Sequence, residues 1–204
     1  MSSVLLATRN RKKLAELQRI LGDQVTVLGL ADLPTFGEEP ETGATFEENA
    51  VAKAVQAAVA TGEISLADDS GLAVDALNGM PGVLSARWSG RHGDDEANNS
   101  LLLAQLGDVP EERRGAAFVC ALALAVPGAE PVVRRGEWRG RIVREVKGRN
   151  GFGYDPLFVP TESDALGAGR TSAELASAEK DELSHRGRAI ALMLPDLRVA
   201  LGLA

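Results

Sequence analysis

The sequence predicts a mixed α/β domain whose sheet has about five or six strands running in mixed directions. Short apolar runs bounded by turn residues alternate with longer segments in which apolar residues recur at helical spacing. Residues 115–126 and 132–146 give the two longest strand patterns, and the second alternates polar and apolar residues. The chain has 204 residues, of which 45% are hydrophobic, so it can bury a sizeable core.

The composition excludes several classes of protein. With 22 basic and 29 acidic residues, the formal net charge is −7, which argues against a nucleic-acid-binding protein. Two histidines and one cysteine are too few for a zinc site built from nitrogen and sulfur ligands. The single Cys120 allows no intramolecular disulfide, and no apolar run approaches the roughly 18 residues of a membrane span. We therefore expect a soluble cytoplasmic protein that binds neither nucleic acid nor membranes.

The first predicted elements are a buried strand at residues 4–7, a polar turn, a helix and a second strand at residues 25–30. Asn10 is a suitable N-cap for the helix, and Gly22 lies where a C-terminal glycine is expected. Free N–H groups at such a helix start can bind phosphate. A solvated basic turn is the alternative, although it is slightly unfavourable to the helix dipole. The residues available for an anion are Thr8, Arg9, Asn10, Arg11, Lys12 and Lys13.

An acidic loop and a second helix come next. Residues 31–43 are rich in glutamate, proline and glycine, and loops of this length are often functional. A capping box at Thr45 predicts a helix over residues 46–60. Asn49 and Lys53 lie four positions apart, so they share one face of this helix. We assign Lys53 a substrate-facing role, although a lysine on an alanine-rich helix is usually only solvated.

Two adjacent carboxylates, Asp68 and Asp69, separate two short apolar runs. The runs, residues 64–67 and 72–74, are predicted as separate strands joined by a turn. Adjacent carboxylates repel unless they are solvated, meet a cation or turn toward the backbone. A hard ion such as Mg²⁺ suits the pair because it takes oxygen ligands and usually arrives with a phosphate. Asp-Asp-Ser-Gly is also good turn chemistry without any function, so both interpretations stay open at this point.

A second candidate site lies in the glycine-rich loop of residues 148–156. Aromatic residues make up only 4% of the chain, so the presence of Phe152 and Tyr154 beside three glycines indicates a specific role for these rings rather than random packing. One ring can stack on a planar base while Asp155 accepts a hydrogen bond from a ring N–H. The other ring is expected to fill the core beneath the loop.

Three further patterns complete the secondary structure. Asp94 is a suitable N-cap for a helix that runs to about Gln105, and residues 157–159 form a short strand. A closing helix follows Ser184, and Pro195 within it predicts a kink or a break.

Several blocks of residues along nearly the whole chain occur in an order typical of one enzyme family. The blocks are Ala7-Thr8-Arg9-Asn10 with Lys13, Glu41-Thr42-Gly43 with Phe46, Glu48-Asn49-Ala50 with Lys53, Ala67-Asp68-Asp69-Ser70-Gly71-Leu72, Pro81-Gly82 with Ser85-Ala86-Arg87, Gly151-Phe152-Gly153-Tyr154-Asp155-Pro156, and Ala173-Glu174-Leu175 with Lys180 and Ser184-His185-Arg186. Together they resemble the inosine/xanthosine triphosphate pyrophosphatases. The resemblance implies Mg²⁺-dependent hydrolysis of ITP, dITP or XTP to the nucleoside monophosphate and pyrophosphate. It also implies a homodimer in which each chain, residues 1–204, is one elongated domain of two lobes with a central cleft.

The resemblance further assigns roles to individual residues. Asp69 is implied as the proton acceptor that activates the attacking water and, with Glu41, as a ligand of Mg²⁺. Lys53 and the turn from Thr8 to Lys13 are implied as phosphate contacts, and Ser70 as a substrate contact. The base would be held by Phe152, stacked on its face, and by Gly153, Tyr154, Asp155, Lys180, His185 and Arg186.

Three alternatives are weighed against this hypothesis. A nucleotide sensor would keep the basic turn and Phe152 but lose the carboxylates, whereas Asp68, Asp69 and Glu41 are all present. A nucleic-acid-binding protein that reads bases through Phe152 and Tyr154 is disfavoured by the net charge of −7. A pyrophosphatase for other aberrant nucleotides, such as modified pyrimidines, is separated from the main hypothesis only by substrate profiling.

Overall fold

The computed structural model describes residues 2–37 and 39–203, apart from the side chains of Ser2, Lys12, Glu16 and Gln24. The chain divides into two compact units. The first unit comprises Met1–Asp69, Cys120–Gly136 and Arg186–Ala204, and the second comprises Ser70–Val119 and Glu137–His185.

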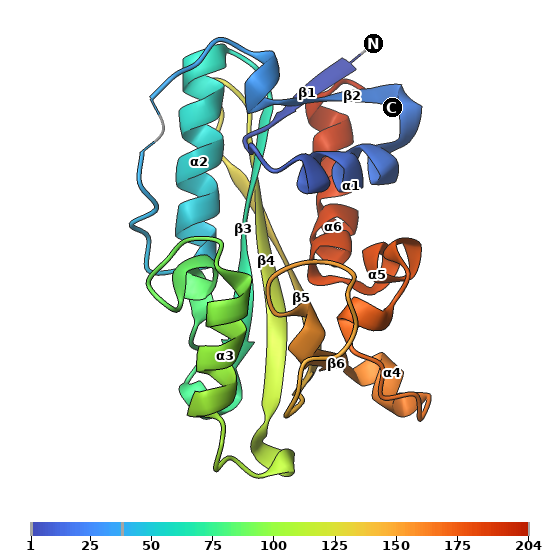
Figure 1. The fold of residues 1–204 in the computed structure, drawn as a ribbon. Coiled ribbons are helices and arrows are strands. Elements are labelled where there is room, and N and C mark those ends of the chain that lie inside the picture. Colours follow the sequence, from blue (N-terminus) through green and yellow to red (C-terminus); the bar gives the residue numbers. More distant parts are fainter. Residues whose placement is uncertain (1, 38, 204) are drawn as a thin grey trace. The chain divides into compact units, whose positions relative to one another are not determined.

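Six strands in the described part of the chain form one mixed sheet with the order β2-β1-β3-β4-β5-β6 (Figure 1). Strand β1 pairs in parallel with β2 and β3, whereas β5 and β6 are antiparallel. The mixed α/β class and the number of strands predicted from the sequence are therefore confirmed. The strands are β1 (Ser2–Leu6), β2 (Val25–Gly29), β3 (Ser65–Val74), β4 (Gly115–Ala125), β5 (Val132–Ile142) and β6 (Phe158–Pro160).

The longer helices begin and end close to their predicted positions. Thr45 and Glu48 form the expected capping box at the start of α2, and Gly62 ends this helix in the left-handed conformation. Asp94 caps α3 through the N–H of Ala97. No helix in residues 2–37 or 39–203 is long and apolar enough to cross a membrane. The α-helices are α1 (Arg11–Leu21), α2 (Phe46–Thr61), α3 (Asp95–Gln105), α4 (Thr161–Ala165), α5 (Ser177–Leu183) and α6 (His185–Ala200).

Helix α6 runs through Pro195 without a break, so the predicted break at this proline is wrong, while the alternative of a kink stays a prediction. Met193 and Leu197, on either side of the proline, are almost fully buried in the core of the first unit. Their packing stabilises the helix around the position where proline removes a backbone hydrogen bond. Strand β5 also ends at Ile142, earlier than predicted, and the next residue, Val143, instead donates its N–H to the carbonyl of Leu157.

In the first unit, side chains alternate between two faces of the sheet. Val4 and Leu6 of β1 pack in one cluster with Leu17 of α1 and with residues of α6. Leu5, between them, packs with Ala57 of α2 instead. Because successive strand residues point to opposite faces, α1 and α6 cover one face and α2 covers the other.

The second unit has its own apolar core beneath α3. Leu102 of α3 and Leu106, which directly follows this helix, pack with Trp138, Phe158 and other buried residues. The fully buried guanidinium of Arg114 donates to the carbonyls of Leu106, Val109, Ile142 and Val143, so one side chain joins the end of α3 to the end of β5.

Strand β3 corrects the sequence prediction at the paired carboxylates. Residues 64–67 and 72–74 were expected as two strands joined by a turn, but Ser65–Val74 is one continuous strand. Asp68 and Asp69 are therefore neighbours within a strand and are only 5% and 7% exposed. Leu66 packs with α1 and α6, so Asp68, two residues on, points to that face and Asp69 points to the face covered by α2. Each face supplies polar partners that replace the solvent of a turn.

Candidate active site

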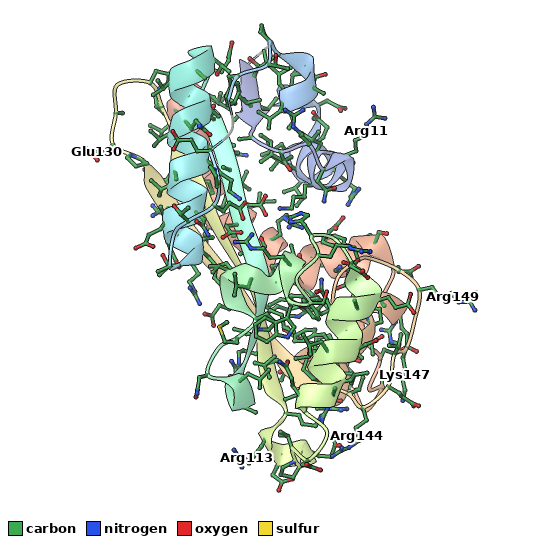
Figure 2. The ribbon with its side chains drawn as sticks, turned by 60° about the vertical axis from the view of Figure 1, so that its left-hand side comes forward. Arg11, Arg113, Glu130, Arg144, Lys147 and Arg149 are labelled. Atoms are coloured by element: carbon green, nitrogen blue, oxygen red, sulfur yellow. The ribbon has the colours of Figure 1, made fainter. Side chains whose placement is uncertain are left out.

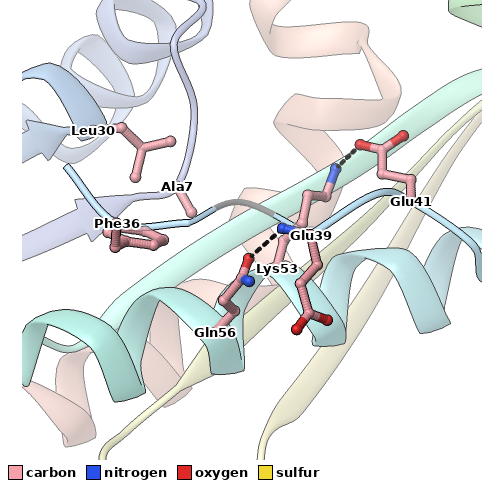
Figure 3. Close-up of a pocket in the computed structure, with 7 residues that line it drawn as sticks. All are labelled: Ala7, Leu30, Phe36, Glu39, Glu41, Lys53 and Gln56. Atoms are coloured by element: carbon pink, nitrogen blue, oxygen red, sulfur yellow. Dashed lines mark hydrogen bonds and ion pairs between the residues drawn. The ribbon is translucent and has the colours of Figure 1, made fainter.

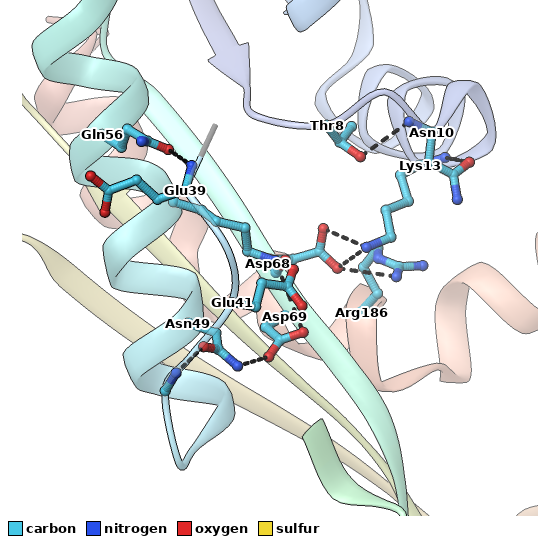
Figure 4. Close-up of polar contacts among 12 residues, drawn as sticks. Thr8, Asn10, Lys13, Glu39, Glu41, Asn49, Gln56, Asp68, Asp69 and Arg186 are labelled. Carbon is cyan, nitrogen blue, oxygen red and sulfur yellow. Dashed lines mark hydrogen bonds and ion pairs between the residues drawn. The ribbon is translucent and has the colours of Figure 1, made fainter. Parts of the chain in front are cut away.

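Asp68 lies in a buried cluster of charges on the face formed by α1 and α6 (Figure 4). Its carboxylate accepts from Lys13 Nζ at 2.8 and 3.0 Å and from Arg186 at 3.2 Å. Burial alone would raise the pKa of Asp68, but the positive charges of Lys13, Arg186 and Lys53 hold it well below its usual value. Asp68 is therefore a permanent anion, and it anchors two cations that are far apart in the sequence.

Asp69 points to the opposite face and has a different environment. Asn49 Nδ2 of α2 donates to Asp69 Oδ2 at 2.9 Å, and Lys53 Nζ lies 3.9 Å from Asp69 Oδ1. Burial raises the pKa of Asp69, and the negative charges of Glu41 and Asp68 add to this, while Lys53 and Asn49 partly offset it. A carboxylate with a raised pKa is a better proton acceptor, so Asp69 is suited to general-base catalysis.

Lys53 links the acidic loop to strand β3. Its ammonium donates to Glu41 Oε1 and to the carbonyl of Asp68, both at 2.8 Å, and also faces Asp69. Burial lowers the pKa of Lys53, but the carboxylates of Asp69, Glu41 and Asp68 outweigh this and raise it overall. The lysine is thus a fixed positive charge between two carboxylates, Glu41 and Asp69, and the expected sharing of one helix face with Asn49 is confirmed.

A small pocket lies beside Lys53 within the first unit (Figure 3). Its volume is about 90 Å³, which is far below the ~300 Å³ or more of a pocket that encloses a small-molecule ligand. Gln56 Oε1 accepts from the N–H of Glu39 at 3.3 Å and so ties the acidic loop to α2 beside this pocket. The pocket is lined by Ala7, Leu30, Phe36, Glu39, Glu41, Lys53 and Gln56.

The polar turn between β1 and α1 forms the predicted helix cap. Thr8 Oγ1 accepts from the N–H of Asn10 at 3.2 Å, and Asn10 Oδ1 accepts from the N–H of Lys13 at 3.4 Å. The first turn of α1 contains no acidic residue, so the positive end of the helix dipole is reinforced by cations. This is a suitable place for an anion. Arg9 and Arg11 are exposed, with Arg11 projecting outward from α1 (Figure 2), and the side chain of Lys12 lies outside the described residues.

In the second unit, the glycine-rich loop presents the ring of Phe152. This side chain is 40% exposed, and Lys180 Nζ lies 5.2 Å from the centre of its ring. Tyr154, by contrast, is 4% exposed, packs in the core and donates its hydroxyl to the carbonyl of Ser85 at 2.9 Å. One aromatic side chain thus fills the core, as expected, and the other offers a ring face for stacking.

The carboxylate of Asp155 organises this loop from the inside. It is 2% exposed, and it accepts from the N–H of Phe152 at 2.8 Å, from Ser172 Oγ at 2.8 Å and from Lys180 Nζ. Gly151 makes this arrangement possible, because a Cβ there would lie 2.0 Å from Asp155 Oδ2. Asp155 therefore fixes both Phe152 and Lys180.

The remaining predicted residues lie near strands β3 and β4. His185 begins α6 and stacks on Phe118, with the ring centres 5.0 Å apart, and is 7% exposed. The next residue, Arg186, belongs to the cluster around Asp68. Ser70 follows Asp69 in β3 and is partly buried.

Comparison with known proteins decides the family. Residues 4–196 match the family model of the Ham1 family. The chain belongs to this family. A Nocardia farcinica protein named dITP/XTP pyrophosphatase is 64% identical to this Ham1 family member over 201 residues, which cover 97% of this chain and 95% of the relative. A Mycobacterium tuberculosis protein of the same name is 62% identical over 201 residues, covering 97% of this chain and 96% of the relative.

Two solved structures agree with the fold. A Mycobacterium abscessus structure described as a nucleoside-triphosphatase and dITP/XTP pyrophosphatase matches with a TM-score of 0.78 and 61% identity, over 95% of this chain and 99% of that chain. The Staphylococcus aureus Ham1 protein matches with a TM-score of 0.85 and 41% identity, over 96% and 98%. The family and the fold class inferred from the sequence blocks are confirmed.

Sequence reasoning gave no role to several residues that support the site. The sequence places Asn49 only on a helix face shared with Lys53, yet its Nδ2 donates to Asp69 Oδ2 at 2.9 Å. Asp95 and Asn99 were not singled out, although both bond the backbone of Gly153. Their spacing of four residues on α3 was the available signal, but the sequence does not show which loop that helix face meets.

Proposed function

We propose that this chain hydrolyses the non-canonical purine nucleotides ITP, dITP and XTP to the nucleoside monophosphate and pyrophosphate. The observation that carries the proposal is the near full-length identity of 64% and 62% to relatives named dITP/XTP pyrophosphatase. The chemistry of the residues supports it, because one set suits a triphosphate and the other suits a planar base. Removal of such nucleotides would cleanse the nucleotide pool.

Asp69 is the proposed base that takes a proton from the attacking water. Its burial favours the protonated form of the carboxyl group, so it accepts this proton more readily than a solvated aspartate. Lys53 and Lys13, together with the N-terminal N–H groups of α1, neutralise the phosphates. Phosphoryl transfer depends mainly on positioning and charge neutralisation, so these residues suffice for the protein's share of the reaction.

Mg²⁺ is the proposed cofactor, and the donor set fits it. In the part of the chain that the structure describes, no group of three or more histidine, cysteine or acidic residues forms a metal cage. Mg²⁺ usually binds through one or two carboxylates plus substrate phosphates, and Glu41 and Asp69 both face the same ammonium of Lys53. When bound, Mg²⁺ would supply further neutralisation of phosphate charge.

Recognition of the base is proposed for the residues around Phe152. Its exposed ring offers a stacking face, and Lys180 is held beside it by Asp155. A 6-oxo purine has a hydrogen-bond acceptor where adenine has an amino group, so donors such as His185 or Arg186 would favour hypoxanthine and xanthine. A mismatch of that kind changes the selectivity between two substrates by about 10⁴-fold in a closed site.

We also propose a homodimer that acts in the cytoplasm, on the strength of the family resemblance.

Product analysis tests the proposal. The protein is incubated with ITP, XTP, GTP and ATP in parallel, with Mg²⁺ or with EDTA, and products are separated by anion exchange. We expect IMP and pyrophosphate from ITP only with Mg²⁺, and much slower turnover of ATP and GTP. Formation of IDP and orthophosphate would mean that a different bond is cut. Binding of ITP without turnover would instead favour a nucleotide sensor.

A further inference from the structure

Two side chains of helix α3 hold one peptide of the glycine-rich loop. Asp95 Oδ2 accepts from the N–H of Gly153 at 2.7 Å, and Asn99 Nδ2 donates to its carbonyl at 3.0 Å. The two residues are four apart, so they lie on the same face of α3. Gly153 has a φ of +61°, a conformation that other residues rarely adopt. Both hydrogen-bonding groups of this glycine are therefore fixed by a neighbouring element.

The side chain of Asn99 has a cost in stability. Its side chain is 7% exposed, and its buried Oδ1 finds no hydrogen-bond partner among the residues that the structure describes. A buried acceptor without a partner destabilises the folded state, and native proteins have few of them. A leucine of similar size would avoid this cost but would lose the donor that bonds the Gly153 carbonyl. The contact with the glycine-rich loop is therefore what the asparagine contributes here.

The fixed peptide lies between two aromatic residues with different surroundings. On one side, Tyr154 is anchored in the core through its ring and its bond to Ser85. On the other side, the N–H of Phe152 is held by Asp155, while its ring is 40% exposed. The backbone that carries the exposed ring is thus held at Phe152, Gly153 and Tyr154. A ring presented in this way is preorganised, which reduces the entropy lost when a ligand stacks on it.

We propose that Asp95 and Asn99 are positioning residues that set affinity and selectivity for the base by fixing the loop that carries Phe152. The inference rests on the proposed function, because it concerns how the same enzyme recognises its substrate. Asp95 and Asn99 belong to the second unit, whereas the proposed base Asp69 and its partner Lys53 belong to the first. We therefore expect their loss to change binding of the base and to leave the chemical step intact. The expected signature is a rise in KM at nearly constant kcat, with reduced discrimination between ITP and GTP.

Variants of Asp95 with a matched control test the first contact. We expect Asp95→Ala to raise KM for ITP about tenfold, the order expected when a charge-assisted hydrogen bond behind a contact residue is lost. Asp95→Asn keeps an oxygen that can accept from Gly153, so it should stay within about twofold of wild type. Glu96 is exposed in the same helical turn. Glu96→Ala removes an equal charge from the helix N-terminus but leaves both contacts to Gly153 in place, so its KM should not change.

Asn99→Asp tests the second contact with an almost isosteric side chain. It replaces the donor that faces the Gly153 carbonyl with an acceptor, so KM for ITP should rise and the ratio of kcat/KM for ITP over GTP should fall by about tenfold or more. Inhibition by IMP should weaken in parallel in Asp95→Ala and Asn99→Asp. Inhibition by inorganic pyrophosphate should stay unchanged, because that ion has no base. General unfolding would weaken both inhibitors.

The outcomes separate the inference from the proposed function. If the wild-type protein fails to hydrolyse ITP, the proposed function is wrong. If the wild-type protein hydrolyses ITP but Asp95→Ala and Asn99→Asp keep its KM and its selectivity, the positioning role is wrong. Equal loss of kcat for every nucleotide, at unchanged KM, would also overturn it.

Discussion

Tyr154 gives a spectroscopic test of how the core beneath the glycine-rich loop is packed. It is the only tyrosine in the chain, so the absorbance of tyrosinate near 295 nm reports this one side chain. Burial raises the pKa of Tyr154 well above its usual value, and the negative charge of Asp95 adds to the effect. We expect the folded protein to show no tyrosinate at a pH where the same chain in denaturant is largely ionised.

The effect on stability follows from proton linkage. The folded state favours the neutral phenol, so the contribution to stability is complete below the unfolded pKa of about 10 and is lost as the pH rises through the folded pKa. Between these two values the unfolded chain binds one proton fewer than the folded chain. The free energy of unfolding therefore falls by about 1.4 kcal/mol per pH unit from this residue. Tyr154→Phe removes this slope, although it also costs about 1 kcal/mol through the lost hydrogen bond to Ser85.

The assay combines a pH titration with urea unfolding. Absorbance at 295 nm is followed from about pH 8 to pH 11.5 in buffer and in urea, while circular dichroism confirms that the buffered sample is folded. Urea unfolding at several pH values above 9.5 then compares wild type with Tyr154→Phe, which cancels the titration of lysines common to both. A tyrosinate midpoint near 10 in folded protein, or equal pH slopes for the two proteins, would refute the reasoning.

Three further substitutions test other parts of the structure. Asp69→Asn should abolish turnover while nucleotide binding, measured by calorimetry, stays largely intact, because the change removes a base but little volume. Near wild-type turnover would contradict the assignment of Asp69 as the base. Gly151→Ala should raise KM for ITP several-fold in steady-state assays, since its Cβ would lie 2.0 Å from Asp155 Oδ2 and displace the partner of Lys180; an unchanged KM would contradict this. Arg114→Leu should lower the free energy of unfolding in urea by about 3 kcal/mol or more, because it removes the buried hydrogen bonds from one guanidinium to the carbonyls of Leu106, Ile142 and Val143; a loss below about 1 kcal/mol would contradict it.

Helix ends could be predicted from the sequence because the signals that set them are local. Thr45 bonds the N–H of Glu48, three residues away, and Asp94 bonds that of Ala97. Such caps form between neighbours whatever surrounds them. The exception, Pro195, is also instructive: its local preference was correct, but buried neighbours in a long helix outweighed it.

The candidate site was predictable in its residue types and less so in its contacts. Lys53 and Asn49 share a helix face because of their spacing, and this brought both to Asp69. The bonds of Asp155 could not be predicted, because Ser172 and Lys180 reach it from 17 and 25 residues away. The charges that keep Asp68 ionised come from positions 55 and 118 residues distant. Only the folded chain brings these groups together.

The position of Asp68 and Asp69 within strand β3, rather than in the predicted turn, explains how two adjacent aspartates acquire different chemistry. In a solvated turn, Asp68 and Asp69 would have similar surroundings and would mainly repel each other. Within β3 they point to opposite faces, and Asp68 meets two cations while Asp69 meets an amide and a more distant ammonium. The pKa of Asp68 is therefore held low and that of Asp69 is raised. One carboxylate becomes a fixed anchor for Lys13 and Arg186, and the other is left able to take a proton. Pairs of acidic groups pushed apart in this way are how one fold supplies both a permanent charge and a base.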